Sequence, residues 1–408
     1  MKNVVLLTID VLREDVVGLY GHRQGLTPFL DSLRGNALLF TRCRSTGPYT
    51  QAAFPGLLAS SYFLEYGTPR QLSPQRTLVS EVVKRGGFAT AAFHSNAYLS
   101  EYAGWNRGWD YFYDSMQERV TEMVPYIPGA ALNRKVDNWL QSYLRRGAGR
   151  PFFLWVHYMD VHEPYVPEEK WLQKIDPRLR LSKQEMLLLF KGVLLPRRAV
   201  DPAEVDTLRK LYQAHVLEVD EYVRGLFGVL EQHGMLGNSI VIITADHGEE
   251  FGEHGGLSHD GKMYAELINV PLIVYQPDRE EGRTIDTVVS GVDIAPTVAS
   301  LFDLPPADNW HGQSLLPVES YASRGAFGEA IGKRTQKIAD TDGPVHFYQQ
   351  DCLKIIHCKR ENTWELYDLE EDPQERNNLV EESAATDDMK NQLRSRITWP
   401  LPGSPRAR

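Results

Sequence analysis

The chain has 408 residues, of which 42% are hydrophobic and 24% are charged. This length and balance can bury one large core or two modest ones, and they exclude a disordered or fibrous polypeptide. Acidic residues exceed basic residues by 54 to 44, so we expect no general nucleic-acid-binding surface. No apolar run approaches the roughly 20 residues that a membrane-spanning helix needs.

The cysteines and the N-terminal residues bear on the cellular compartment. Cys43, Cys352 and Cys358 are too few and too scattered for a disulfide framework or a CxxC zinc site. The apolar run Val4 to Leu7 is too short for a signal peptide. We therefore expect reduced thiols in a cytoplasmic protein.

Short apolar runs rich in Val, Ile and Phe alternate with segments of helical period. This alternation predicts an α/β fold in which helices flank a mostly parallel central sheet. The expected strands are Val4 to Thr8, Ala37 to Phe40, Phe88 to Phe93, Phe152 to His157, Ile240 to Thr244 and Leu272 to Tyr275.

Helices are expected between these strands. Thr27 followed by Pro28 predicts a helix N-terminus, and an apolar stripe through Trp139 predicts another crossover helix. The longest expected helix runs from about Asp201 to His233, because apolar residues recur there every three or four positions. Gly234 should end it.

The pattern of apolar and polar residues changes near the C-terminus. Short alternating segments and a polar helix predict a small α+β subdomain. The expected division is a main α/β domain at 1–315, the subdomain packed on it at 316–398, and a mobile tail at 399–408, which is rich in proline.

Several polar residues fall just after expected strands. Asp10 follows the first strand, Asn96 the third, His162 the fourth, and Asp246 with His247 the fifth. Open parallel sheets bind ligands beyond the carboxyl ends of their strands, so these side chains are expected to converge on one pocket.

The adjacent Asp246 and His247 lie in a glycine-rich turn, where both side chains can face one cation. An imidazole ligand suits zinc or manganese better than calcium. The alternative is a solvated acidic loop. For Asp10, a helix-capping or turn role is an equally open alternative to a metal role.

Thr50 stands just before an expected helix. A helix N-terminus offers unpaired N–H groups and a positive dipole end, so an anionic ester group would be favoured beside this hydroxyl. Thr50 could equally be a plain N-cap residue.

The chain resembles the sulfatase branch of the alkaline phosphatase superfamily over nearly its whole length. The matching segments, in order, are Val4-Val-Leu-Leu-Thr-Ile-Asp10, Phe152-Phe-Leu-Trp-Val-His157-Tyr-Met-Asp160-Val-His162-Glu-Pro-Tyr165, Asp246-His247-Gly248, Gly252-Glu-His254-Gly, Tyr264-Ala-Glu-Leu-Ile-Asn-Val-Pro271, Val292-Asp293-Ile-Ala-Pro296-Thr297 and Glu365-Leu-Tyr-Asp-Leu-Glu-Glu-Asp-Pro373. Each segment is short, but their order and spacing are specific. The resemblance implies an alkaline phosphatase-like fold.

The resemblance also implies a metal site. Asp10, Asp246 and His247 would bind a divalent cation together with the nucleophile, and Thr50 occupies the nucleophile position. Zinc or manganese is favoured, and magnesium or calcium would also be compatible. A second cation held by Asp160 and His162 is a further alternative.

Three more residues match family positions that contact the ester group. His162, in the pattern His-x-Pro-Tyr, would contact the ester or protonate the leaving group. His259 matches a second such position, and Asn96 takes roughly the place of an anion-binding side chain. His157 and His215 are expected to be core histidines instead.

One departure from the family concerns the nucleophile. Sulfatases convert Cys or Ser in the pattern Cys/Ser-x-Pro-x-Arg into formylglycine, whereas this chain has Thr50-Gln-Ala52-Ala-Phe54. Oxidation of threonine would give a ketone, so no formylglycine is expected. Threonine nucleophiles do occur in superfamily relatives that act on phosphodiesters.

These features predict a metal-dependent hydrolase or transferase of phosphate esters, with diesters favoured, that uses a metal-activated Thr50. The alternatives are a sulfuric ester hydrolase and a binding protein on the same fold that has lost turnover. The expected substrate is a small-molecule, glycan or lipid-headgroup ester. The sequence leaves the natural substrate and the oligomeric state open.

Overall fold

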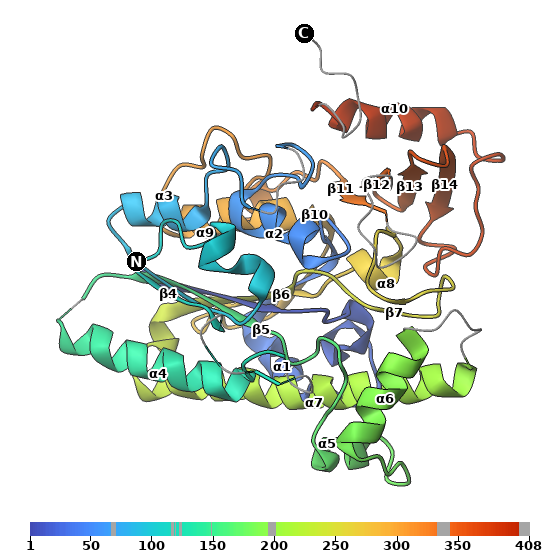
Figure 1. The fold of residues 1–408 in the computed structure, drawn as a ribbon. Coiled ribbons are helices and arrows are strands. Elements are labelled where there is room, and N and C mark those ends of the chain that lie inside the picture. The colour runs from blue at the N-terminus through green and yellow to red at the C-terminus, as the bar shows by residue number, and fades with distance from the viewer. Residues whose placement is uncertain are drawn as a thin grey trace.

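An eight-stranded sheet forms the centre of the computed structural model, which describes residues 1–66, 71–115, 118, 120–121, 125–147, 149–194, 201–332 and 343–399 (Figure 1). The strand order is β10-β2-β9-β6-β1-β5-β3-β4. The strands are β1 (Asn3–Ile9), β2 (Ala37–Arg44), β3 (Ala89–Phe93), β4 (Tyr111–Tyr113), β5 (Phe152–Tyr158), β6 (Ser239–Ala245), β9 (Leu272–Tyr275) and β10 (Arg283–Ser290). This arrangement confirms the predicted α/β class.

The middle strands are apolar because both faces of the sheet are covered. Every residue of β1, β5 and β6 is buried, and β1 pairs in parallel with both of the others. Continuous runs of Val, Leu and Ile are typical of parallel strands covered on both faces. The parallel pairing places the carboxyl ends of β1, β5 and β6 side by side.

Helices form a layer on each face of the sheet (Figure 1). One layer holds α1 (Pro28–Ser32), α4 (Gly129–Arg145), α5 (Glu169–Ile175), α6 (Lys183–Leu194) and α7 (Pro202–Gln232); the other holds α2 (Thr50–Ala59), α3 (Val79–Arg85) and α9 (Ile294–Leu301). The long α7 contacts all four other helices of its layer. The Asp201 side chain caps α7 by accepting a hydrogen bond from the Ala203 N–H at 2.9 Å, close to the predicted start.

The structure adds three features to the predicted sheet. Strands β4 and β10 were not predicted, and β9 runs antiparallel to β2 and β6. Strand β10 lies at one edge, and its first half is largely exposed and polar, as in Arg283, Thr284 and Asp286. A polar edge strand lacks the continuous apolar run that marks a central one.

A four-stranded antiparallel sheet and one helix form a C-terminal subdomain. Its elements are β11 (Ala326–Ile331), β12 (Pro344–Gln350), β13 (Leu353–Cys358), β14 (Thr363–Asp368) and α10 (Thr386–Arg396). The α+β character agrees with the prediction, while the boundary at 315 and 316 stays a prediction.

Trp399 is buried and its ring stacks on Tyr62 with centroids 5.6 Å apart. The rest of the predicted tail, 400–408, lies outside the described residues. Within the described part of the chain, no helix has the length and apolar content to cross a membrane.

Candidate active site

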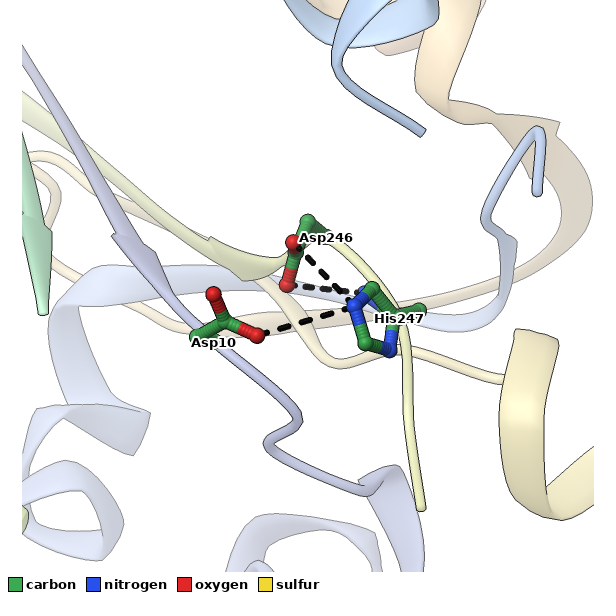
Figure 2. A group of neighbouring side chains, drawn as sticks. All are labelled: Asp10, Asp246 and His247. Atoms are coloured by element: carbon green, nitrogen blue, oxygen red, sulfur yellow. Dashed lines mark hydrogen bonds and ion pairs between the residues drawn. The ribbon is translucent and has the colours of Figure 1, made fainter. Parts of the chain in front are cut away.

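The ends of β1 and β6 bring Asp10 and Asp246 together. Ile9, the last residue of β1, pairs with Ala245 of β6 on one side and with Tyr158 of β5 on the other. The residue that follows β1 is Asp10, and the residue that follows β6 is Asp246. Figure 2 shows both carboxylates near the ring of His247. The predicted convergence at the carboxyl edge of the sheet therefore brings these three side chains together.

The backbone at both aspartates takes unusual turns. Val11, which follows Asp10, has a φ of 54°, in the left-handed region that β-branched residues rarely occupy. At Gly248 a Cβ atom would lie 2.0 Å from the Glu266 carbonyl oxygen, so only glycine fits there. Strained or glycine-dependent backbone of this kind is concentrated at functional sites.

Asp10, Asp246 and His247 each offer one ligand atom, and these atoms lie within 4.8 Å of one another. His247 Nε2 is 3.6 Å from Asp10 Oδ1 and 3.4 Å from Asp246 Oδ2. All three side chains are completely buried. Two carboxylate oxygens and one imidazole nitrogen in a buried cluster form a donor set that suits a divalent transition metal.

The hydrogen bonds around this cluster leave the same three atoms unpartnered. The His247 Nδ1 donates to the Gly248 carbonyl at 2.9 Å, and Asp246 Oδ1 accepts the His247 N–H at 3.0 Å. Asp10 Oδ2 accepts from Asn96. Asp10 Oδ1, Asp246 Oδ2 and His247 Nε2 have no hydrogen-bond partner among the residues that the structure describes. Unsatisfied buried polar atoms are rare and costly, so three that face one point fit a cation.

The pKa values agree with this donor set. Burial and the neighbouring charge of Asp10 raise the pKa of Asp246 well above its usual range. Burial alone would also raise the pKa of Asp10, but the hydrogen bond from His157 and nearby histidine charges bring it below its usual range. Burial lowers the pKa of His247 to about 3, so its imidazole is neutral and able to ligate. A cation would offset the repulsion between the two carboxylates.

Thr50 lies beside this cluster, at the first position of α2. The Asn96 amide nitrogen is 3.4 Å from Thr50 Oγ1 and 3.1 Å from Asp10 Oδ2, so one side chain contacts both. Asn96 is itself held because its Oδ1 accepts the Tyr98 N–H at 2.9 Å. Thr50 and Asn96 are 3% and 4% exposed, which excludes a surface role for either residue.

Phe54 stands where the formylglycine pattern would have its arginine. Its ring is fully buried and packs edge-on against the His157 ring, with centroids 5.0 Å apart. It also contacts Trp155. The side chain at this position therefore belongs to the apolar core beneath the site and offers no charge to an anion.

His162 and His259 lie next to each other and next to the metal-binding cluster. The His259 ring centroid is 5.0 Å from that of His162 and 4.7 Å from that of His247. Burial would lower the pKa of His259, but Glu249, whose carboxylate is 3.1 Å from His259 Nδ1, raises it to about 10. A cationic imidazole in this position suits an anionic ester.

The structure gives the contacts of three further residues that the sequence singled out. His157 is fully buried, as predicted for a core histidine, but its Nε2 also lies 3.2 Å from Asp10 Oδ2. His215 has only a structural role, accepting the Val166 N–H at 3.0 Å. Both Asp160 oxygens accept the Gly129 N–H at 3.0 Å, and the second cation with His162 stays a prediction.

Comparison with known proteins gives the family. A model of the Sulfatase family matches residues 2–304, and one of the N-sulphoglucosamine sulphohydrolase C-terminal family matches 252–399. The chain is 26% identical to the uncharacterized sulfatase YidJ of Escherichia coli (strain K12), over 93% of this chain and 83% of that protein. It is 29% identical to arylsulfatase K of Bos taurus, over 98% and 82%.

The fold has a solved counterpart as well. The crystal structure of the phosphonate monoester hydrolase of Agrobacterium radiobacter superposes with a TM-score of 0.77 at 19% identity, covering 97% of this chain and 95% of that one. The first family match spans about three quarters of the chain and includes the segments that carry Asp10, Thr50 and Asp246. The chain therefore belongs to the sulfatase family of hydrolases.

Proposed function

We propose that this sulfatase-family protein is a metal-dependent hydrolase or transferase of phosphate esters, with diesters favoured, and that Thr50 is its nucleophile. The observation that carries the proposal is a set of three buried ligand atoms without a hydrogen-bond partner among the described residues, linked to the Thr50 hydroxyl through Asn96. Thr50 and Asp10 share one contact, the Asn96 amide nitrogen. A hydroxyl beside a metal-binding cluster is the arrangement that nucleophilic catalysis by an alcohol needs.

Asp10, Asp246 and His247 would hold the cation, with Thr50 Oγ1 as a further ligand. Zinc or manganese is favoured over calcium because one ligand is an imidazole. When bound, such a cation supplies the positive charge that stabilises a deprotonated hydroxyl and the negative charge of the transition state.

The side chains of the site would then divide the remaining work. Thr50 Oγ1, after its proton has passed to solvent water, attacks phosphorus in line with the leaving oxygen, forming one P–O bond as the other breaks. Asn96 Nδ2 donates to the reacting oxygens, and His162 Nε2 protonates the leaving oxygen. Water, or an acceptor alcohol in a transferase, then attacks the phosphothreonine and gives its proton to His162, while the released Thr50 oxygen takes up a proton from solvent.

Threonine at position 50 favours phosphorus over sulfur. A threonine cannot become the hydrated aldehyde that releases sulfate in formylglycine sulfatases, and Phe54 replaces the arginine of that pattern. The similarity in fold to a phosphonate monoester hydrolase also supports a phosphorus ester. The second candidate is sulfate ester hydrolysis, favoured by the 29% identity to an arylsulfatase.

The experiment compares turnover of bis(4-nitrophenyl) phosphate, 4-nitrophenyl phosphate and 4-nitrophenyl sulfate by protein loaded with manganese or zinc. We expect the diester to be hydrolysed fastest. Thr50→Ala should lower that rate by about a thousandfold or more, since it removes the nucleophile. Thr46→Ala is the matched control: it also removes a buried threonine hydroxyl from this loop, but its partners are the carbonyls of Ala52 and Ala53.

Each other result points to a different conclusion. Preferential hydrolysis of the sulfate would favour the sulfatase alternative. Full activity of Thr50→Ala would exclude Thr50 as the nucleophile. Tight metal binding without turnover of any ester would favour a binding protein.

A further inference from the structure

Three histidines of the site share one arrangement of their ring nitrogens. In His247, Nδ1 lies 2.9 Å from the Gly248 carbonyl oxygen, and in His162 it lies 2.7 Å from the Glu163 carbonyl oxygen. A carbonyl oxygen can only accept, so Nδ1 carries a hydrogen, and Nε2 is left to bind a metal or, when it is protonated as well, to donate to a substrate oxygen. In His259, Nδ1 lies 3.1 Å from the Glu249 carboxylate, which leaves Nε2 available in the same way.

His259 differs from the other two in the source of its partner. His247 and His162 use a backbone carbonyl of the next residue, which no substitution of a side chain removes. His259 uses a side chain ten residues earlier in the sequence. Its orientation therefore depends on Glu249 in a way that can be tested.

Glu249 is held on all sides. It is completely buried, and its second carboxylate oxygen accepts a hydrogen bond from the Tyr165 hydroxyl. Its backbone N–H donates to the Glu266 carbonyl at 2.9 Å, and its own carbonyl accepts from Arg13 at 2.8 Å. A residue held at its backbone N–H, its backbone carbonyl and its carboxylate is a rigid support for the ring that it binds.

The backbone at Ser258, directly before His259, also helps to hold His259 in place. Ser258 has a φ of 67°, in the left-handed region, and its hydroxyl donates to Glu163 at 2.6 Å. Ser258 is the last residue of β8 (Leu257–Ser258), which pairs with β7 (Glu250–Phe251) in a short hairpin. Residues other than glycine adopt a left-handed conformation only when the surrounding structure enforces it.

A second cation is the competing explanation for these residues. Glu163, Glu249 and His259 also place three ligand atoms within 4.8 Å. Among the described residues, however, none of their atoms is a buried polar atom without a partner, whereas Asp10, Asp246 and His247 each have one. Both Glu249 oxygens, one Glu163 oxygen and His259 Nδ1 already have hydrogen-bond partners, which favours a role in holding His259.

We propose that Glu249 is a positioning residue, which acts through His259 by fixing the ring so that Nε2 faces the ester. This inference rests on the proposed function, because it assigns His259 to the substrate. Tyr165 supports Glu249 from the opposite side. The group that His259 would contact is an anionic ester oxygen.

Nitrogen-15 NMR of the imidazole rings tests the orientation without any turnover. In the wild-type protein, His259 should show a hydrogen on Nδ1 bonded to a carboxylate. Glu249→Ala should abolish this signature, and Glu249→Gln should keep a hydrogen bond through its amide oxygen. The His247 ring should be unchanged in both variants, because its partner is a backbone carbonyl.

Kinetics test the functional part. Glu249→Ala should lower kcat by about 10- to 100-fold with metal affinity unchanged, and Glu249→Gln should recover most of the loss. Because Glu249 acts through His259, the double variant with His259→Ala should be no slower than His259→Ala alone. Tyr165→Phe, which keeps the core packing, should give a smaller decrease.

Three results would overturn the inference. They are an unchanged His259 spectrum in Glu249→Ala, additive effects in the double variant, and a loss of bound metal that accounts for the whole decrease in rate. If the wild-type protein hydrolyses no phosphate ester, the proposed function fails, but the spectra still decide whether Glu249 orients His259.

Discussion

At the scale of single residues, a chain of hydrogen bonds connects the core of the sheet to Asp10. The Trp155 indole donates to Thr8 Oγ1 at 3.0 Å, and that hydroxyl lies 2.8 Å from His157 Nδ1. His157 Nε2 then lies 3.2 Å from Asp10 Oδ2. If the hydroxyl donates to Nδ1, the hydrogen of the ring is on Nε2 and points at the carboxylate. One oxygen of Asp10 is thereby fixed, and the other is left for the cation.

His157→Ala should weaken metal binding by about 10- to 100-fold, because it removes a hydrogen bond that orients a metal ligand. A competition titration with a chromophoric chelator measures the affinity. His94→Ala is the matched control, since His94 is equally buried and stacks on Trp155 at 5.2 Å but has no contact with Asp10. An equal loss in both variants would mean that core packing, not the hydrogen bond, is responsible.

At the scale of elements, the loop after β6 is held by the C-terminal subdomain. The short helix α8 (Ala265–Ile268) begins where the Ala265 N–H donates to the Glu375 carboxylate at 2.7 Å. The same carboxylate forms an ion pair with Lys354 of β13 at 2.5 Å, and both side chains are about 1% exposed or less. Glu375 also accepts a hydrogen bond from His254 through its carbonyl at 3.0 Å. The loop that carries His247, Glu249 and His259 is therefore anchored from outside the main sheet.

Glu375→Ala should destabilise the protein by about 3 to 5 kcal/mol, because it leaves the Lys354 ammonium buried without a partner. Urea unfolding followed by circular dichroism measures this loss. The double variant Lys354→Met with Glu375→Leu should regain most of it, since apolar residues of similar volume can replace a buried ion pair. A double variant as unstable as the single one would mean that the Ala265 hydrogen bond, not the ion pair, dominates.

The same elements show how far the sequence could predict the structure. Strands β1 and β6 were predicted because both are continuous apolar runs, and the aspartates that follow them were recognised as candidate ligands. The partner of each imidazole nitrogen was not predictable, because it depends on how loops fold back over the sheet. From the sequence, Glu249 could not be told apart from the other acidic residues of its loop. His157 was predicted only as a core histidine.

At the scale of the whole molecule, the C-terminal sheet is joined to the main domain through buried polar groups. The Glu329 N–H of β11 donates to the Thr46 carbonyl at 2.9 Å, in the loop before Thr50. The Glu329 carboxylate accepts the Leu64 N–H; its other oxygen is buried, has no hydrogen-bond partner in the described part of the chain and lies 3.7 Å from His346 Nε2. Burial raises the pKa of Glu329 to about 8. The folded protein thus carries a protonated carboxyl group between its two parts at neutral pH.

This proton makes stability depend on pH. Between about pH 4.5 and 8, the folded state keeps a proton on Glu329 that the unfolded state, with an ordinary pKa of 4.5, has released. The contribution of Glu329 is therefore fully present below pH 4.5 and is lost as the pH rises, at up to about 1.4 kcal/mol per pH unit. Glu329→Gln should flatten the fall in unfolding free energy from pH 5 to pH 8, measured by urea titration at each pH.

Glu370→Gln, which removes a charge from an exposed position, should leave the wild-type slope in place. Equal slopes for wild type and Glu329→Gln would show that Glu329 ionises in the folded protein as readily as in the unfolded chain.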